Sequence, residues 1–192
     1  MSKTLILITG ANQGLGYYAA QQLAATGKYH VLVGSRDLKK AEKAIETIVA
    51  DADTKNSSED LEAIQIDVTD DDSIAAAVKT VEQKYGKLDI LLNNAGIALQ
   101  QEGSGAALRK LYYDHYNANV FGAAVTSEAF LPLLRQGEKR LAFTSSGLGS
   151  ITQIADGTYG AIVCCSVPST MKQVRVLTID HSTQSTALPS PL

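Results

Sequence analysis

Short apolar runs alternate with amphipathic stretches along most of the chain. The apolar runs have the length of buried strands and cover 3–9, 30–34, 61–66, 88–92 and 140–144. Each is separated from the next by a stretch long enough for a crossover helix, which parallel neighbours require. The pattern therefore predicts an α/β fold, a doubly wound parallel sheet with helices on both faces.

The intervening stretches carry helix signals. Predicted helices cover about 14–26, the stretch that follows Asp37, 74–85 and about 105–134. Asp37 is a good N-cap, and the acidic residues before 74–85 suit the positive end of a helix dipole. Gly27 and Gly86 follow the last periodic positions of their helices, as C-terminal stops do. The polar stretch 51–60 is predicted as a surface loop.

Composition limits the class of protein. The chain has 192 residues, 45% of them apolar and 19% charged, which fits a single domain with an adequate core. A net charge of −3 argues against nucleic acid or an anionic membrane as the main partner and favours a small ligand. The sequence shows neither a run of about 18 apolar residues nor a signal peptide at its start, so a cytoplasmic protein without membrane contact is expected.

A glycine-rich turn, 9–16, lies between the first predicted strand and the first predicted helix. Its spacing is G-x-x-x-G-x-G. A strand, such a turn and a helix together build a phosphate site, because the helix N-terminus offers unpaired N–H groups to an anion. Taken alone, the glycines are equally compatible with a purely steric role at a strand end. The adjacent Cys164 and Cys165 have neither disulfide nor metal-site spacing, and no metal site is predicted.

Six motifs in order point to one family. They are Thr9 to Gly16, Asp67-Val68, Asn93-Asn94-Ala95-Gly96, Asn119-Val120-Phe121-Gly122, Ser145-Ser146-Gly147 and Tyr159-Gly160-Ala161. Their order and spacing resemble the short-chain dehydrogenases/reductases, especially the carbonyl-reductase-like members, over roughly 3–161. The resemblance implies a Rossmann-type sheet, an NAD(H) or NADP(H) cofactor and oxidoreduction between a carbonyl and an alcohol.

The resemblance also implies catalytic residues. Asn119 matches the asparagine that holds a proton-relay water, Ser146 the serine that polarises the substrate, and Tyr159 the general acid/base. Tyr159 lies 159 − 146 = 13 residues after Ser146, which is the family spacing. Hydride delivery to a carbonyl leaves negative charge on oxygen, so a hydroxyl donor and a proton-donating phenol suit the reaction.

Cofactor preference follows from the end of the second strand. An NAD-selective site needs a carboxylate there, whereas this chain has Arg36, so NADP(H) is expected. Asn12 is placed to reach the 2′-phosphate as well. The alternative for Arg36 is a solvated loop cation.

The remaining cofactor assignments come from the motifs. Asp67 is read as a partner of the adenine amino group, or alternatively as strand-end polarity, with Val68 packing the ring. Asn93 either joins the fourth strand to its neighbour or contacts ribose, and Ala95 and Gly96 leave room for the cofactor. The predicted cofactor-binding set is Gly10, Asn12, Gln13, Gly14, Leu15, Gly16, Arg36, Asp67, Val68, Asn93, Ala95, Gly96 and Tyr159.

The chain departs from the family after 161. The family has a lysine four residues after the tyrosine, and this chain has Val163, while Pro168 breaks any helix begun at Tyr159. We therefore expect a Rossmann core over 1–161 and a divergent segment of the same domain over 162–192. Val174 to Ile179 is a candidate sixth strand, and 182–192 is expected to be disordered.

Two functions stay open on this evidence. One is an NADP(H)-dependent oxidoreductase with impaired activity, and the other is a non-redox or inactive nucleotide-binding protein. A truncated, mis-spliced or repurposed C-terminal part would each explain the lost pattern. Homodimerisation through the 105–134 helix is the family arrangement, but Pro168 is expected to disturb it and to leave apolar surface exposed.

Overall fold

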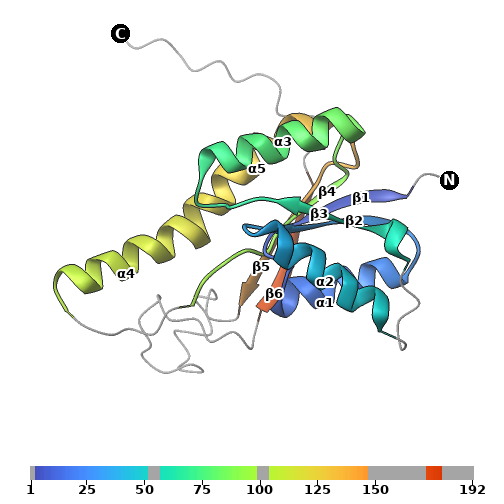
Figure 1. Ribbon diagram of the computed structural model, residues 1–192. Coiled ribbons are helices and arrows are strands. Elements are labelled where there is room, and N and C mark those ends of the chain that lie inside the picture. The colour runs from blue at the N-terminus through green and yellow to red at the C-terminus, as the bar shows by residue number, and fades with distance from the viewer. Residues whose placement is uncertain (1–2, 52–56, 99–103, 147–171, 179–192) are drawn as a thin grey trace, which may run out of the picture.

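One sheet organises the chain (Figure 1). In the computed structural model, which describes residues 3–51, 57–98, 104–146 and 172–178, six strands lie in the order β3-β2-β1-β4-β5-β6. They are β1 (Thr4–Ile8), β2 (Tyr29–Ser35), β3 (Leu61–Gln65), β4 (Ile90–Asn93), β5 (Arg140–Ser146) and β6 (Lys172–Thr178). The first five pair in parallel, so the predicted Rossmann-type sheet is confirmed.

The sixth strand differs from its neighbours. β6 begins two residues earlier than the predicted run 174–179 and pairs with β5 in the antiparallel direction, from Arg140 opposite Thr178 to Ser146 opposite Lys172. An antiparallel neighbour needs no crossover helix, so the strand can return along β5 directly. The sheet is therefore mixed at this edge rather than parallel throughout. The rest of 162–192 lies outside the described residues, including the stretch expected to be disordered.

The helices follow the predicted start and stop signals. They are α1 (Gly14–Ala25), α2 (Leu38–Ala50), α3 (Asp71–Tyr85), α4 (Ala106–Tyr116) and α5 (Gly122–Gln136). Asp37 accepts a hydrogen bond from the N–H of Lys39, and Asp70 accepts one from Asp72, as N-caps do. Gly86 ends α3 with φ +68°. Of the predicted loop 51–60, Ser58–Asp60 forms a short 3₁₀ turn and 52–56 lies outside the described residues.

The predicted helix over 105–134 is interrupted. A single π-helical turn, Asn117–Phe121, joins α4 to α5, and the N–H of Gly122 donates to the carbonyl of Asn117 five residues back. Figure 1 shows α4 reaching away from the sheet while α5 packs over it. A π turn inserts one extra residue into the ladder, which a 3.6-residue periodicity cannot anticipate.

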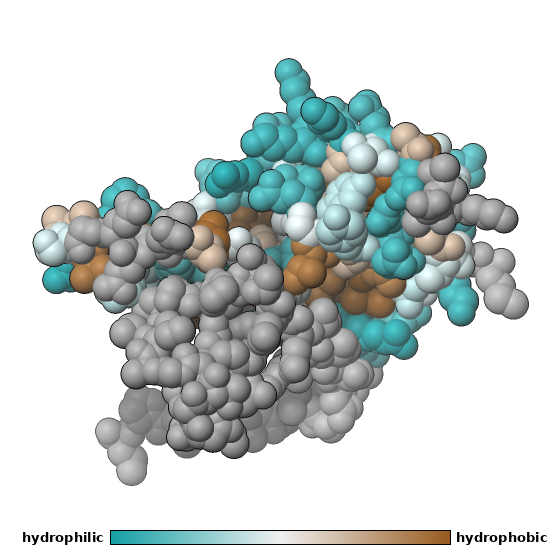
Figure 2. Space-filling model, turned by 90° about the horizontal axis from the view of Figure 1, so that it is seen from below, coloured by the Kyte–Doolittle hydropathy of each residue, from teal (hydrophilic) through white to brown (hydrophobic). Residues whose placement is uncertain are grey.

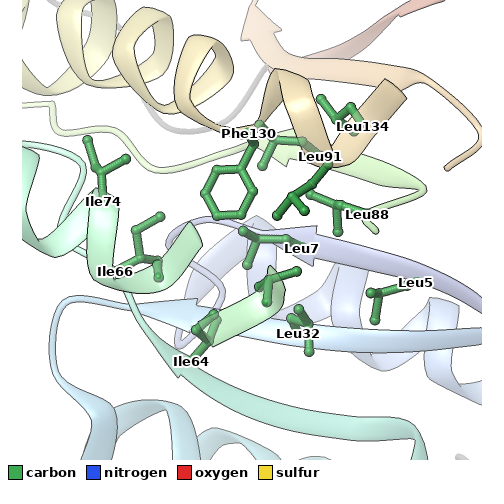
Figure 3. Close-up of a cluster of buried hydrophobic side chains, with 13 residues drawn as sticks. Leu5, Leu7, Leu32, Ile64, Ile66, Ile74, Leu88, Leu91, Phe130 and Leu134 are labelled. Atoms are coloured by element: carbon green, nitrogen blue, oxygen red, sulfur yellow. The ribbon is translucent and has the colours of Figure 1, made fainter. Parts of the chain in front are cut away.

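Helices cover both faces of the sheet, and alternate side chains of β1 pack into two hydrophobic cores. Leu5 and Leu7 belong to one core and Ile6 and Ile8 to the other, as the two-residue period of a strand requires. The first core adds side chains of α3 and α5, including Ile74, Val81, Phe130 and Leu134 (Figure 3). The second core adds side chains of α1 and α2: Ala20, Ala24, Ala41 and Ile48.

The surface seen from below in Figure 2 is mostly polar where it is described, with one patch of brown apolar side chains among teal ones. Among the helices of the described part of the chain, none combines the length and apolar character that crossing a bilayer would need.

A polar network ties β2, β3 and α3 together at the amino-terminal edge of the sheet. Glu62 Oε2 accepts hydrogen bonds from Tyr85 Oη at 2.6 Å and from Lys84 Nζ at 2.5 Å. His30 Nε2 lies 3.0 Å from the same tyrosine oxygen. Burial acts to raise the pKa of Glu62, but the hydrogen bonds from Lys84 and Tyr85 outweigh it and the pKa is lowered. Burial and the bond to Glu62 raise the pKa of Tyr85.

The network predicts acid sensitivity. A lowered pKa in the folded state means that Glu62 contributes stability above its unfolded pKa of about 4.3, and that this contribution is lost as pH falls through the folded value. The difference in unfolding free energy between wild type and Glu62→Gln should therefore be largest near neutral pH and shrink towards pH 3. Urea denaturation across that range measures it. A difference that grows on acidification would contradict the assignment, and Tyr85→Phe, which removes one donor, should reduce the effect only in part.

Candidate functional site

The candidate site lies at the carboxyl ends of β1 and β4. These central strands are neighbours, and the helix after β1 packs on one face while α5, which follows β4, packs on the other. Chains that leave adjacent strands towards opposite faces open a crevice between them. The predicted glycine turn follows β1, and Asn94-Ala95-Gly96 follows Asn93, the last residue of β4, so both segments lie where such a crevice is expected.

Two glycines allow the glycine-rich turn to pack closely against the segment after β4. Gly10 has φ +63°, and a Cβ built on it would lie 2.8 Å from Cα of Ala95. A Cβ on Gly16 would lie 2.4 Å from Nδ2 of Asn94 and 2.7 Å from the Gly10 carbonyl. Any larger residue would push these segments apart, so the glycines are required for close packing as well as for conformation.

Thr9 and Asn94 join the two segments through buried hydrogen bonds. Asn94 Nδ2 donates to the carbonyls of Thr9 at 3.0 Å and Gly10 at 3.2 Å, and Thr144 Oγ1 donates to Asn94 Oδ1 at 3.2 Å. Thr9 Oγ1 accepts from the N–H groups of Asn94 and Ala95, both at 3.0 Å. Thr9 and Asn94 with these hydrogen bonds form a hub that links β1, β4 and β5. The sequence analysis assigned no role to either residue, although both lie inside the motifs. The available signal was a polar residue directly after each of two apolar strands.

The N-terminus of α1 is open to a ligand. Gln13 occupies the N-cap without a side-chain hydrogen bond, and the first turn holds no acidic residue. Gln13, Gly14 and Leu15 are exposed, and Asn12 is half-buried with no side-chain hydrogen bond in the described part of the chain. An uncapped N-terminus presents unpaired N–H groups and the positive end of the dipole. The turn therefore suits a phosphate group.

Three predicted residues lie at the ends of β2 and β3. Arg36 follows β2 with its side chain exposed, and its carbonyl accepts a hydrogen bond from Gln65 Nε2 at 3.3 Å. Asp67 Oδ1 accepts from the N–H and the hydroxyl of Thr69, so this oxygen is already used within its own loop. Val68 is buried, and a Cβ on Gly122 would lie 2.5 Å from its carbonyl oxygen. Gly122 thus brings α5 against the loop that carries Val68.

The segment after β4 divides its residues between packing and the crevice. The Asn93 side chain is buried and donates to Ser127 Oγ of α5 at 2.9 Å, while its Oδ1 has no partner in the described residues. The side chain thus joins β4 to α5, and the predicted ribose contact stays a prediction. Ala95 is half-buried and Gly96 is exposed, so this part of the segment is accessible.

Asn119 lies in the π-helical turn and is fastened to the same segment. Its Nδ2 donates to the carbonyl of Ile97 at 2.9 Å, and its Oδ1 accepts from the Ile97 N–H at 2.8 Å. A Cβ on Gly96 would lie 3.0 Å from Oδ1, so the contact depends on that glycine. The side-chain amide therefore spends one of its two N–H groups and one acceptor position of its oxygen on Ile97. The relay role stays a prediction.

The other catalytic candidates are only partly located. Ser146 is the last residue of β5, at the same carboxyl edge as the crevice, and its backbone alone is described. Tyr159 and Val163 lie outside the described residues. Within the part that is described, no group of three or more His, Cys, Asp or Glu side chains is arranged to hold a metal ion.

An apolar stripe follows the outer side of α4, the π turn and α5. Its exposed members are Tyr113, Tyr116, Val120, Phe121 and Val125. The rings of Tyr116 and Phe121 lie 6.4 Å apart. Dimerisation through this helix stays a prediction, and the stripe is the surface that it would bury. His115, in contrast, is buried, with Nδ1 2.9 Å from the carbonyl of Leu111.

Comparison with known proteins places the chain among dehydrogenases. The family described as short chain dehydrogenase matches residues 4–162. The curated short-chain dehydrogenase anuI of Penicillium roqueforti (strain FM164) is 48% identical over 154 residues, which cover 79% of this chain and 59% of that protein. The chain thus spans little more than half the length of this relative.

Two solved structures with bound cofactor are similar in fold. ElxO with NADP bound is 28% identical with a TM-score of 0.59, covering 70% of this chain and 52% of that one. The 3-ketoacyl-(acyl-carrier-protein) reductase of Brucella melitensis, complexed with NADH, is 27% identical with a TM-score of 0.57, covering 69% and 50%.

The hub can be tested by removing the Asn94 side chain. Asn94→Ala leaves the carbonyls of Thr9 and Gly10 and the hydroxyl of Thr144 without their partner, so it should lower the unfolding free energy by about 2–4 kcal/mol. Asn12→Ala is the matched control, since that asparagine makes no side-chain hydrogen bond in the described residues, and it should cost less than about 0.5 kcal/mol. If urea denaturation gave equal losses of unfolding free energy for the two variants, Asn94 would contribute no more to stability than Asn12 does.

Proposed function

We propose, from the premise that this chain belongs to the short chain dehydrogenase family, that it is an NADP(H)-dependent oxidoreductase acting on a carbonyl/alcohol pair. Its named relatives in this family are dehydrogenases and reductases. The single observation that carries the proposal is the junction at the carboxyl ends of β1 and β4, where the uncapped N-terminus of α1 follows a turn that Thr9 and Asn94 bind to the segment after β4. Because the chain spans little more than half of its relative, the activity of the whole protein is part of the proposal.

The residues around the crevice fit a dinucleotide. Gly10 and Gly16 let the backbone approach a pyrophosphate closely, and the N–H groups at the start of α1 would hold it. Val68 and Asp67, which follow the end of β3, would border the adenine, and Asp67 Oδ2 would remain for its amino group because Oδ1 accepts from Thr69. Ala95 and Gly96 would flank the nicotinamide half. NADP(H), when bound, would supply or accept the hydride.

The choice of NADP(H) rests on charge. No carboxylate follows β2 immediately, and the first charged side chain there is the exposed Arg36. A guanidinium binds a 2′-phosphate through paired charge-assisted hydrogen bonds, whereas a carboxylate would bind the unphosphorylated ribose. The similar structures were solved with NADP in one case and NADH in another, so this chain's own residues make the argument.

Catalysis is proposed for Asn119, Ser146 and Tyr159, with Asn119 as the residue that holds a proton-relay water. The Ser146 hydroxyl would stabilise the developing oxyanion, and the Tyr159 phenol would pass a proton to it. Val163 leaves that phenol without the neighbouring cation that the family uses, so turnover should be slow. The alternative that this departure favours is a nucleotide-binding protein without turnover. The proposed substrate is a small carbonyl compound or alcohol, and binding to nucleic acid is not proposed. The proposed location of the protein is the cytoplasm.

The cofactor preference predicts a selective loss in one variant. The wild type should bind NADPH more tightly than NADH, and Arg36→Ala should weaken NADPH binding by about 10- to 100-fold, since one charge-assisted contact is worth about 1.5–3 kcal/mol. NADH affinity should stay the same and serves as the internal control. Fluorescence titration with both cofactors measures this. Equal wild-type affinities, or an Arg36→Ala variant that keeps its preference, would overturn the assignment.

Turnover provides the second test. NADPH oxidation with a panel of ketones, quinones and aldehydes should be very slow for the wild type and undetectable for Tyr159→Phe. Val163→Lys should raise the rate, because a cation favours the phenolate and each unit of pKa is worth about 1.4 kcal/mol. Rapid wild-type turnover that Tyr159→Phe abolishes would show that another group replaces the lysine. Cofactor binding with no turnover in any variant would favour the nucleotide-binding alternative.

A further inference from the structure

His30 lies where four elements meet at the amino-terminal edge of the sheet. It is the second residue of β2, and its half-buried ring contacts the 3₁₀ turn Ser58–Asp60 and the end of α3. Nδ1 lies 3.0 Å from the carbonyl oxygen of Glu59, and Nε2 lies 3.0 Å from Oη of Tyr85. On β3, Oε2 of Glu62 lies 3.6 Å from the same Nε2. Both ring nitrogens therefore face oxygen atoms.

The protons available to these contacts can be counted. A backbone carbonyl only accepts, so Nδ1 must carry a proton to bind Glu59. The Tyr85 hydroxyl has one proton, and its oxygen lies within hydrogen-bond distance of both Nε2 and, at 2.6 Å, Oε2 of Glu62. The hydroxyl can donate to only one of the two. With a neutral imidazole, one of these contacts would place two lone pairs against each other without a proton between them.

Glu62 is the stronger acceptor for the Tyr85 proton. Burial acts to raise the pKa of Glu62, but the hydrogen bonds from Lys84 and Tyr85 lower it, so the carboxylate is ionised at neutral pH. Burial and the bond to Glu62 raise the pKa of Tyr85, so the phenol keeps its proton. An ionised carboxylate accepts a stronger hydrogen bond than a neutral nitrogen does. The contact between Tyr85 and Nε2 of His30 therefore needs a second ring proton.

The other charged groups near the ring come from α3 and the 3₁₀ turn. Lys84 Nζ lies 2.5 Å from the carboxylate oxygen that faces the ring, and this cation acts against a second positive charge there. On the turn, Asp60 pairs with Lys3. The Glu59 side chain is exposed, so water screens its charge. Glu62 is therefore the anion that balances a charged ring.

We propose that His30, Tyr85 and Glu62 form a proton-dependent clamp, in which the doubly protonated ring of His30 ties β2 to the 3₁₀ turn and to α3. With both ring protons in place, Nδ1 donates to Glu59, Nε2 donates to Tyr85, and Tyr85 donates to Glu62. Each of these contacts then has one donor and one acceptor. When Nε2 loses its proton, the contact between β2 and α3 is lost.

The clamp should respond to pH near neutrality through His30. Histidine is the side chain type whose charge changes between about pH 5 and 8, whereas Glu62 stays ionised and Tyr85 stays protonated through neutral pH. The folded chain offers the second ring proton partners that the unfolded chain lacks, so its contribution to stability is present at low pH and lost as pH rises. This direction is opposite to that expected for Glu62. The clamp therefore holds β3, the first strand in the sheet order, at lower pH and releases it at higher pH.

Nuclear magnetic resonance can observe the ring protons directly. Long-range ¹H–¹⁵N spectra distinguish a doubly protonated imidazole from each neutral tautomer, and His30→Gln identifies the His30 signals among the three histidines. At pH 7 both ring nitrogens should carry a proton in the wild type. Tyr85→Phe removes the acceptor of Nε2 and Glu62→Gln removes the balancing anion, so each should leave a singly protonated ring. Lys84→Gln is the matched control, since it removes a neighbouring cation and no part of the clamp, and it should keep both protons.

A neutral His30 ring in the wild type at pH 7 would overturn the inference. The same holds for a Tyr85→Phe variant that keeps both ring protons, and for a Lys84→Gln variant that loses one as the other two do. None of these measurements involves a cofactor, so the proposed function would remain as it is.

Hydrogen exchange tests the release of the edge strand. Between pH 6 and 8.5, after correction for intrinsic exchange rates, the amides of Leu61–Gln65 in β3 should lose about tenfold in protection in the wild type, as one titrating contact would give. His30→Gln, which has no titrating ring, should show little change. The amides of β4 report on global unfolding and serve as the internal control. Equal losses in β3 of both proteins, or equal losses in β3 and β4 of the wild type, would show that His30 does not act as a clamp.

Discussion

The buried contact between Thr9 and Asn94 is the constraint on which the candidate site depends. Parallel pairing aligns β1 and β4, but it does not determine how the chain leaves each strand. The threonine hydroxyl accepts two backbone N–H groups after β4, and the asparagine amide donates to two carbonyls after β1. The Thr9 and Asn94 side chains are buried, so a bond that either of them loses leaves a buried polar atom unsatisfied. The hub therefore holds the turn after β1 and the segment after β4 together.

Close backbone approaches extend this constraint outward. Gly16 sits against Asn94, Gly96 against Asn119, and Gly122 against the carbonyl of Val68. The π-helical turn joins α4 to α5, and the side chain of Asn119 in this turn forms hydrogen bonds with the backbone of Ile97. The contacts of Gly16 and Gly122 each join an element after one strand to an element after another, while the contact of Gly96 closes the connection between β4 and β5. The site is thus built from packing between segments that are separated in sequence.

Polar groups are distributed unevenly between the two edges of the sheet. At the amino-terminal edge, Glu62, Tyr85 and Lys84 bind one another and leave little capacity for a ligand. At the carboxyl edge, the N-terminus of α1 and the lysines of α2 have no such partners in the described chain. Unused donors and cations therefore gather on one side of the molecule, around the glycine turn. This asymmetry is the electrostatic basis of the proposed binding of an anionic cofactor there.

Local sequence determined the elements and their order, because strand and helix periods, the caps Asp37 and Asp70 and the stop at Gly86 act over a few residues. It also indicated the glycine turn, whose role depends on its position between a strand and a helix. The antiparallel direction of β6, the π turn at Asn117–Phe121 and the inward direction of Asn93 required tertiary structure. The same holds for the Thr9 and Asn94 hub. These features depend on which distant segments meet, and a pattern along one chain carries no information on such contacts.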